Sequence, residues 1–224
     1  MRQLKIMSMD FSPNFLLSRR MIPGQNEAMM KIASSYIQEE HSFDVVLLQG
    51  KNAYQRGIEL AKRGDYHLFS EKNASSAILT KQDLPVYKDF VIPGVGNIVI
   101  IPTVYNYLSI ASVSLTSKKE EDRLLKTWNR FTDYDSKEIH TELQVVGGLF
   151  QSQQSLAEVA NKTNLIDTAQ RIQSNCDELK NDSYSILISK EMKLIDPVPH
   201  RQTGLVKEKY IKHCPIGISV QYTN

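Results

Sequence analysis

Histidine and cysteine are the side chains that most often bind zinc or act as nucleophiles, and their spacing in this chain supports neither role. Zinc sites draw ligands from close pairs, such as CxxC or two histidines a few residues apart. The cysteines, Cys176 and Cys214, form no such pair, so we expect buried or idle thiols rather than metal ligands. The histidines have neither HxH nor HxxxH spacing; they are His41, His67, His140, His200 and His213. We therefore expect no metal site.

Two further segments contain residues used in catalysis or phosphate binding, but both lack the residues that would complete a motif. Ser114 has no histidine and acid near it in the sequence, so a serine nucleophile is not indicated. The segment IPGVGN at 92–97 holds two glycines, but no Lys-Ser/Thr pair or helix follows it. We expect a turn there rather than a phosphate-binding loop.

Short apolar runs and amphipathic helices alternate along the chain. In one helix Met29, Ile32 and Tyr36 recur at helical spacing, and in another Leu124, Trp128 and Phe131 share a face. Expected helices cover 25–40, 53–63, 118–131, 153–161 and 165–173. Expected strands cover 3–10, 43–49, 66–70, 76–80, 86–92, 97–102, 108–115, 143–147, 185–189 and 216–221.

Many of these strands follow one another without a helix between them, which favours two sheets over one doubly wound sheet. The predicted fold class is α/β: a four-layer α/β sandwich, in which two mostly antiparallel sheets pack face to face with helices outside. We expect residues 1–224 to form a single domain. Ser117 is a candidate helix cap. The proline-rich segment 196–204 is expected to be a loop that connects two elements or contacts a partner.

Composition excludes several classes of protein. The chain of 224 residues is 41% hydrophobic and 23% charged, which is ordinary for a globular domain. A net charge of +2, from 27 basic and 25 acidic residues, gives no strong signature of nucleic-acid binding. The N-terminus lacks the apolar core of a signal peptide, and no apolar run is long enough to span a bilayer. We expect a soluble protein that is cytoplasmic, or exported without a cleaved signal peptide.

The order of several motifs resembles the endonuclease/exonuclease/phosphatase superfamily, which includes DNase I, abasic-site nucleases and inositol-phosphate phosphatases. The first strand LKIMSMDF, the strand FDVVLLQ and the hairpin YHLFSEKNASSAILTK follow the family's order. Farther along, IASVSL, QVVGGLF and IKHCPIGISV stand where the family has a strand ending in His-Leu, a Gly-Asp-Phe-Asn loop and a final Ser-Asp-His-x-Pro-Val. The resemblance covers almost the whole chain, and it implies a metal-dependent phosphodiesterase fold.

Most catalytic residues that the resemblance implies are replaced here. Gly50 stands at the metal-binding glutamate, and Ser114 at the histidine that contacts phosphate. Lys212 stands at the aspartate that partners the last histidine, which is kept as His213. The remaining positions are Asp10, at the family's asparagine, with Gly148 and Phe150 at the aspartate and asparagine of the Gly-Asp-Phe-Asn loop.

These replacements change the charge that the family's metal ion would meet. Three carboxylates are lost, Lys212 adds a positive charge and Asp10 returns one negative charge, so the site is about three units more positive than the family's. Mg²⁺ requires hard oxygen ligands, above all carboxylates. We therefore expect no metal and no catalytic residues in a remnant site formed by Asp10, Gly50, Ser114, Gly148, Lys212 and His213.

Three functions remain open from the sequence. The preferred one is an inactive relative of these enzymes that binds a protein partner. A second is a metal-free binder of a phosphate-containing ligand or of nucleic acid, with Lys212 and His213 as the anion-binding residues. The third is a divergent metal-dependent nuclease or phosphatase with a rearranged site around Asp10, Asp182 and His213, and only this one would need Mg²⁺.

Overall fold

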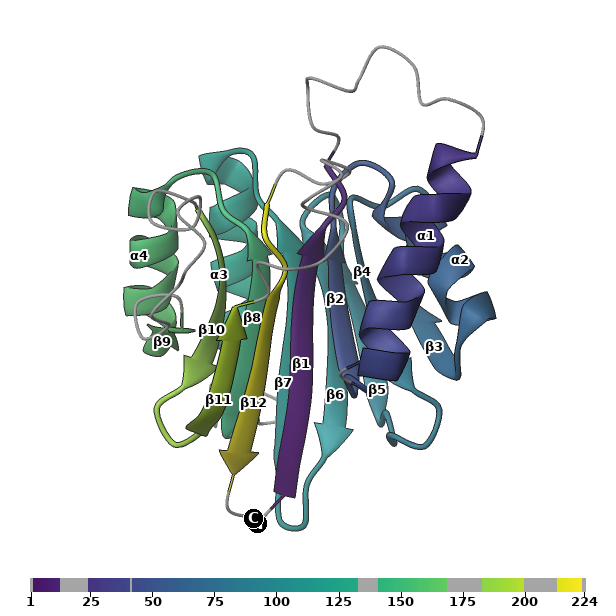
Figure 1. The fold of residues 1–224 in the computed structure, drawn as a ribbon. Coiled ribbons are helices and arrows are strands. Elements are labelled where there is room, and N and C mark those ends of the chain that lie inside the picture. Colours follow the sequence, from purple (N-terminus) through teal and green to yellow (C-terminus); the bar gives the residue numbers. More distant parts are fainter. Residues whose placement is uncertain are drawn as a thin grey trace.

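The structure, a computed structural model, describes residues 2–12, 24–40, 42–132, 141–168, 183–199 and 213–222. These residues form two six-stranded sheets that pack face to face (Figure 1). Each sheet has one parallel pair of strands and four antiparallel pairs. The predicted class, a sandwich of two mostly antiparallel sheets, is confirmed.

The first sheet has the strand order β11-β12-β1-β2-β4-β3. Its parallel pair is β1 with β2, in which Asp10 lies opposite Gln49 at the end of both strands. All five residues of β2 are buried, as expected for an apolar strand covered on both faces. The strands are β1 (Arg2–Asp10), β2 (Val45–Gln49), β3 (Tyr66–Phe69), β4 (Ser76–Lys81), β11 (Lys193–Pro199) and β12 (Ile216–Tyr222).

The second sheet has the order β5-β6-β7-β8-β10-β9. Its parallel pair is β7 with β8, in which Ser114 lies opposite Leu149. The 92–97 segment forms the tight turn between β5 and β6, as the sequence predicted. The strands are β5 (Lys88–Ile92), β6 (Gly96–Pro102), β7 (Tyr107–Ser114), β8 (Leu143–Leu149), β9 (Leu165–Asp167) and β10 (Tyr184–Ser189).

Helices cover the outer face of each sheet and complete four layers (Figure 1). The helices α1 (Gln25–Ser35) and α2 (Ala53–Arg63) pack on the first sheet, where Met30 and Leu60 share a core with Val46. A π-helical turn, η1 (Tyr36–Glu40), extends α1 to the predicted end of that helix. The helices α3 (Lys118–Thr132) and α4 (Gln153–Thr163) cover the second sheet. A third core lies between the sheets.

The start of α3 follows local capping rules. The Ser117 hydroxyl accepts a hydrogen bond from the backbone N–H of Glu120 at 3.4 Å. The Glu120 carboxylate in turn accepts from the backbone N–H groups of Thr116 and Ser117, so it satisfies N–H groups that the helix leaves unpaired. The predicted cap at Ser117 is therefore present. No helix in the described part of the chain is long and apolar enough to span a membrane.

Two predicted elements were wrong. The helix expected at 165–173 begins instead as strand β9, which pairs with β10; residues 169–173 lie outside the described residues. The loop expected at 196–204 is strand through Pro199, because β11 pairs with β12 at the edge of the first sheet; residues 200–204 lie outside the described residues. Proline is tolerated on an edge strand, where its missing N–H breaks no ladder.

Candidate functional site

The parallel strands of both sheets end at the same end of the sandwich, where the side chains between the sheets become polar. Gln49, the last residue of β2, reaches across and donates to the Ser112 hydroxyl of β7 at 3.0 Å. Its Oε1 atom accepts from the hydroxyls of Ser8 at 3.0 Å and Tyr184 at 3.3 Å. Gly147 has no side chain that would separate the sheets here, since an added Cβ would meet Leu47 at 2.4 Å.

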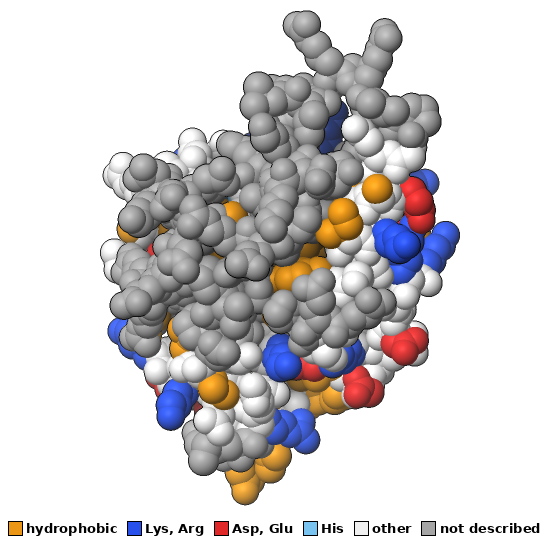
Figure 2. All heavy atoms as spheres, viewed as in Figure 1, with side chains coloured by type: hydrophobic (Ala, Val, Ile, Leu, Met, Phe, Trp, Pro, Cys, Tyr) orange, Lys and Arg blue, Asp and Glu red, His pale blue; other side chains and the backbone are white. Residues whose placement is uncertain are grey.

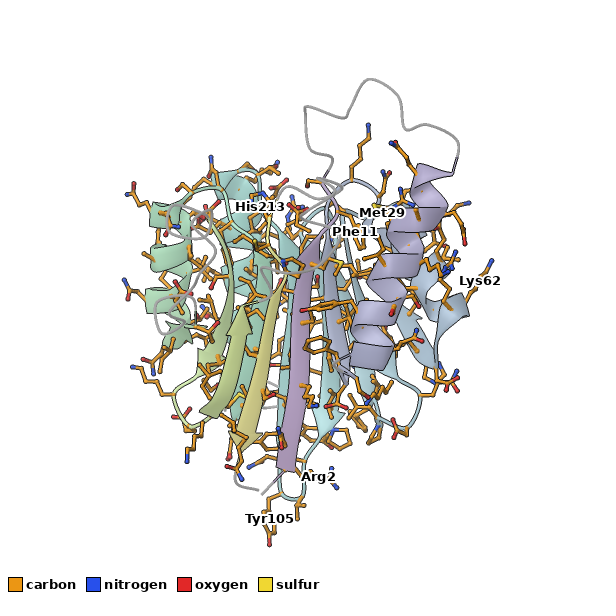
Figure 3. The ribbon with its side chains drawn as sticks, viewed as in Figure 1. Arg2, Phe11, Met29, Lys62, Tyr105 and His213 are labelled. Atoms are coloured by element: carbon orange, nitrogen blue, oxygen red, sulfur yellow. The ribbon has the colours of Figure 1, made fainter. Side chains whose placement is uncertain are left out.

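Asp10 and His213 lie next to this network. Nε2 of His213 is 3.4 Å from Oδ2 of Asp10, and the two side chains are 6% and 0% exposed. The other oxygen of Asp10 accepts the backbone N–H of Ser12 at 2.8 Å. The ring of His213 also packs on Tyr184, with centroids 5.6 Å apart. In Figure 3, His213 and Phe11 lie at one end of the sandwich and Arg2 and Tyr105 at the other.

The geometry of this pair limits its chemistry. Oδ2 of Asp10 is buried and has no hydrogen-bond partner among the described residues, so the contact with His213 is electrostatic rather than a well-aligned hydrogen bond. A carboxylate so placed can stabilise a protonated histidine and hold its ring in one orientation. The pair could therefore move a proton, but both side chains are buried away from solvent.

The backbone around Gly50 leaves no room for a ligand side chain at the end of β2. Its φ of 99° lies in a region that favours glycine. A Cβ atom on Gly50 would stand 2.6 Å from the Ser12 nitrogen, 2.9 Å from the Phe11 carbonyl carbon and 2.9 Å from Oδ1 of Asp10. The backbone after β1 thus occupies the space that a side chain would need.

The second sheet places its predicted residues on two different faces. Ser114 follows the inward-facing Ser112 on β7 and is 6% exposed. Phe150 lies on the opposite face, in the core beneath α3 and α4, so it does not fill the space beside His213. An added Cβ on Gly148 would meet the Val113 carbonyl oxygen at 2.0 Å. Lys212 and Asp182 lie outside the described residues.

The sequence-predicted residues are therefore only partly brought together. Asp10, Gly50 and His213 meet at one point, and Ser114 lies on the inter-sheet face of the neighbouring sheet. Within the described residues, no three His, Cys, Asp or Glu side chains are grouped so that they could hold a metal ion. The Mg²⁺ that the fold family implies does not fit a donor set with Asp10 as its carboxylate and glycine at position 50.

Sequence reasoning missed the polar residues beneath this pair, which are Ser8, Gln49, Ser112 and Tyr184. A signal was present, because Gln49 is the only polar residue in an otherwise apolar strand. A buried polar residue needs partners, and its position at the strand end indicated that they would lie across the sheets.

One expectation about cysteine was also wrong. Cys214 is fully buried and disulfide-bonded, rather than an idle thiol. The chain has one other cysteine, Cys176, which lies outside the described residues. The bonded residue directly follows His213, so the disulfide tethers the chain beside the Asp10–His213 pair.

Comparison with known proteins identifies the fold. No family model matches this sequence, and no curated protein is similar to it at a significant level. Solved structures do match over nearly the full length. An endonuclease/exonuclease/phosphatase from Bacteroides vulgatus is 10% identical, with a TM-score of 0.69 and coverage of 100% of both chains.

Two eukaryotic structures match as well. The human Nocturnin catalytic domain with bound sulfate anion is 11% identical, with a TM-score of 0.68, and covers 99% of this chain and 95% of its own. TDP2 of D. rerio, complexed with single strand DNA product, is 12% identical, with a TM-score of 0.66, and covers 98% of this chain and 99% of its own. The chain therefore has the endonuclease/exonuclease/phosphatase fold that its motif order resembles. Sequence identity of this level shows a shared fold and says nothing about a shared function.

Proposed function

We propose that this protein is a catalytically inactive form of the endonuclease/exonuclease/phosphatase fold that works by binding a protein partner. The observation that carries the proposal is Gly50. The position that should supply the metal-binding glutamate has a positive φ, and its missing side chain is replaced by the backbone of Phe11 and Ser12. A carboxylate there would require the end of β1 to move.

The remaining ionisable groups support the same conclusion. Metal-assisted phosphoryl transfer needs an ion that neutralises the phosphoryl oxygens and orients the attacking water. Asp10 is the one carboxylate in the described part of the remnant site, and its oxygens face the Ser12 N–H and His213. A divalent ion would have to displace both neighbours.

An activity assay tests the loss of catalysis. Purified protein should not cleave single-stranded or double-stranded DNA, RNA, bis-p-nitrophenyl phosphate or p-nitrophenyl phosphate with Mg²⁺ or Mn²⁺. The Asp10→Ala and His213→Ala variants, purified in the same way, set the contamination background. Turnover by the wild type that is abolished in both variants would contradict the proposal.

That result would favour the alternative, a divergent metal-dependent phosphodiesterase with a rearranged site. The observation in its favour is the Asp10–His213 pair, because a carboxylate beside a histidine is an arrangement used for proton transfer. Asp182 would have to supply a further ligand, so Asp182→Asn should then also abolish turnover. The alternative ranks second because Asp10 and His213 are buried and the glutamate position is closed.

Anion binding at Lys212 and His213 is a further candidate function, at the end of the sandwich where Asp10 and His213 lie. In its favour, a protein of this fold, human Nocturnin, has a structure with bound sulfate. Titration of inorganic phosphate by calorimetry should give binding that weakens about tenfold in Lys212→Ala, the loss expected for one charge-assisted hydrogen bond. Equal, negligible heats in both proteins would eliminate this candidate.

The disulfide at Cys214 bears on where the protein works. Disulfides persist in oxidising compartments and are rare in reducing ones. Of the expected locations, we therefore favour an exported protein. Mass spectrometry of protein taken from its native cells under alkylating conditions tests this: a Cys214 that is largely alkylated would indicate a reducing compartment.

A further inference from the structure

The large hydrophobic side chains that are exposed gather at one edge of the second sheet. Among the described residues five such side chains are exposed, and four of them are Tyr87, Val91, Val104 and Tyr105, at 58%, 40%, 56% and 79%. Figure 2 shows a hydrophobic tip at the lower end of the molecule, where Figure 3 places Tyr105.

Tyr87, Val104 and Tyr105 lie toward the same end of the sheet, and Val91 lies near the other end of the edge strand. Val104 and Tyr105 form the turn between β6 and β7, which closes with a hydrogen bond from the Thr103 N–H to the Asn106 carbonyl. Tyr107, next along β7, packs on Tyr87 with ring centroids 5.1 Å apart. Tyr87 leads directly into β5, where Val91 is exposed. Exposed apolar side chains on an edge strand and the neighbouring turn are where an interaction site is expected.

The strand β5 is the outermost strand of its sheet. It pairs with β6 on one side and with no other described strand. An edge strand offers unpaired backbone N–H and C=O groups to a further strand, unless charges prevent the pairing. Lys88 and Asp89 place charges on the first half of β5, whereas the second half, Phe90–Ile92, is apolar.

A cavity lies beside this apolar half, between β5 and α3. Its volume is about 240 Å³, and its apolar walls include Phe90, Pro93 and Phe131. Small-molecule sites usually have roughly 300–1,000 Å³. The cavity therefore fits one large side chain better than a whole cofactor. Phe90 and Phe131 already pack edge to face there, with centroids 5.0 Å apart.

The rim of the cavity is cationic. Arg123 and Arg130 line it from α3, two turns apart on the same face of the helix, and both are exposed. The guanidinium of Arg123 donates to the Pro93 carbonyl, which holds it beside the end of β5. Lys88 lies over the Phe90 ring at 4.6 Å from its centroid. The partner that complements this rim is acidic.

We propose that the β5 edge and the adjoining cavity bind an extended acidic peptide of a partner protein. The peptide would add to β5 as a further strand, place one aromatic side chain in the cavity and set carboxylates against Arg123 and Arg130. Backbone pairing supplies affinity in this mode of recognition, and the pocket supplies specificity. The inference deepens the proposed protein-binding function, but it does not depend on the absence of catalysis.

The test uses a defined probe, a fluorescein-labelled pentapeptide of sequence Glu-Val-Phe-Val-Asp, matched in length to β5. Fluorescence polarisation at low salt should show saturable binding to the full chain. Arg123→Glu combined with Arg130→Glu should weaken it at least about tenfold, since each charge-assisted hydrogen bond lost costs about that factor or more. The matched control is Lys62→Glu, an exposed residue on α2, which packs on the first sheet rather than beside β5; it should leave affinity unchanged.

Two further peptides make the test specific. A peptide with lysine at both ends should bind at least about tenfold more weakly, and one with proline in place of both valines should not bind, because proline cannot donate to a ladder. Equal affinity for all three peptides, or no binding of the acidic peptide at millimolar concentration, would overturn the proposal. The chain could instead dimerise in the absence of peptide, and Arg123→Glu could abolish that dimer. This result would also overturn the proposal, because the occupant of the β5 edge would then be a second copy of this chain.

The outcome is separable from that of the activity assay. Peptide binding together with metal-dependent turnover would leave this proposal standing and refute the proposed inactivity. No turnover together with no peptide binding would leave the proposed inactivity standing and refute the peptide-binding proposal.

Discussion

The two halves of the sandwich have the same topology and close their strand ends differently. In each half a parallel pair of strands is joined by one helix, a second helix follows, and two antiparallel strands continue the sheet. The pair β1–β2 ends in a buried polar cluster around Asp10 and Gln49, whereas β7–β8 ends at Gly148 against the backbone of β7. The first parallel pair therefore ends in polar side chains, whereas the second ends in a glycine that lets two backbones pack closely.

Gly50 and Gly148 make this difference measurable. Both are glycines with positive φ after or near the end of the second strand of a parallel pair. Position 50 is crowded by one movable side chain, Asp10, and by the backbone at Ser12, whereas position 148 is crowded chiefly by the Val113 carbonyl within the sheet. A side chain or a loop can move at modest cost, but a ladder carbonyl cannot move without breaking strand pairing.

The largest effect is therefore expected at Gly148. Gly148→Ala should lower the free energy of unfolding by about 2–6 kcal/mol, because a strained backbone costs about 1–3 kcal/mol and overpacking adds a similar amount. Urea unfolding followed by circular dichroism gives the change. Stability equal to wild type would show that β7 yields easily, and the contrast between the halves would then disappear.

A smaller loss is expected at Gly50. Gly50→Ala should cost about 1–3 kcal/mol, mainly from the backbone conformation, because the chain after β1 can shift away from the new methyl group. Gly50→Glu, which restores the family's ligand, should still fail to bind Mn²⁺ in a calorimetric titration. Tight Mn²⁺ binding by that variant would mean that the remnant site is held open by the rest of the fold.

The polar cluster around Gln49, which joins the end of β2 to the second sheet, is expected to contribute to stability through buried hydrogen bonds. Gln49→Leu should cost about 2–4 kcal/mol, since it leaves the buried hydroxyls of Ser8 and Ser112 without their shared partner. Ser112→Ala is the matched control, because it removes one partner and leaves Gln49 with the others. If Gln49→Leu proved neutral, the cluster would be replaceable by apolar packing, and its retention would need another explanation.

The sequence predicted most of the fold because the periodicity of apolar residues was strong. The helix at 53–63 agrees with the predicted bounds, and β2 lies within the predicted strand. The prediction failed at β9, because a strand of three residues is too short to show an alternating apolar pattern. Its pairing with β10 is decided by tertiary contacts. The prediction failed at β11 because proline is a poor local indicator of a strand and the edge position is set by β12.

The candidate site was less predictable than the fold. Motif order indicated that Asp10 and His213 would meet, since each adjoins a strand end. It could not indicate which face of β8 Phe150 would occupy, because a shift of one residue exchanges the two faces of a strand. The cationic cavity beside β5 was also invisible, since Phe90 and Arg123 come from elements that only the folded chain brings together.

The helix pairs extend the comparison to the surface. In the first half Glu27 of α1 meets Arg63 of α2 at 2.6 Å. In the second half Glu158 of α4 meets two cations, Lys118 of α3 at 2.7 Å and Lys162 of its own helix at 2.5 Å. Hydrogen bonds from Lys118 and Lys162 lower the pKa of Glu158 to about 2.

The smallest predicted effect follows from this depressed pKa. A carboxylate whose pKa is lower in the folded state stabilises the protein above its unfolded pKa, and that stabilisation is lost as the pH falls through the folded pKa. Glu158→Gln should therefore lower stability slightly at pH 7 and flatten the decline in stability between about pH 5 and pH 2. Because the ion pairs are exposed, the difference should shrink in 1 M NaCl. Glu27→Gln, at a carboxylate with one cationic neighbour, is the control and should change stability at pH 7 less. Urea midpoints from pH 2 to pH 7 measure both variants, and identical pH profiles for wild type and Glu158→Gln would show that the two lysines give α4 no more than Arg63 gives α1.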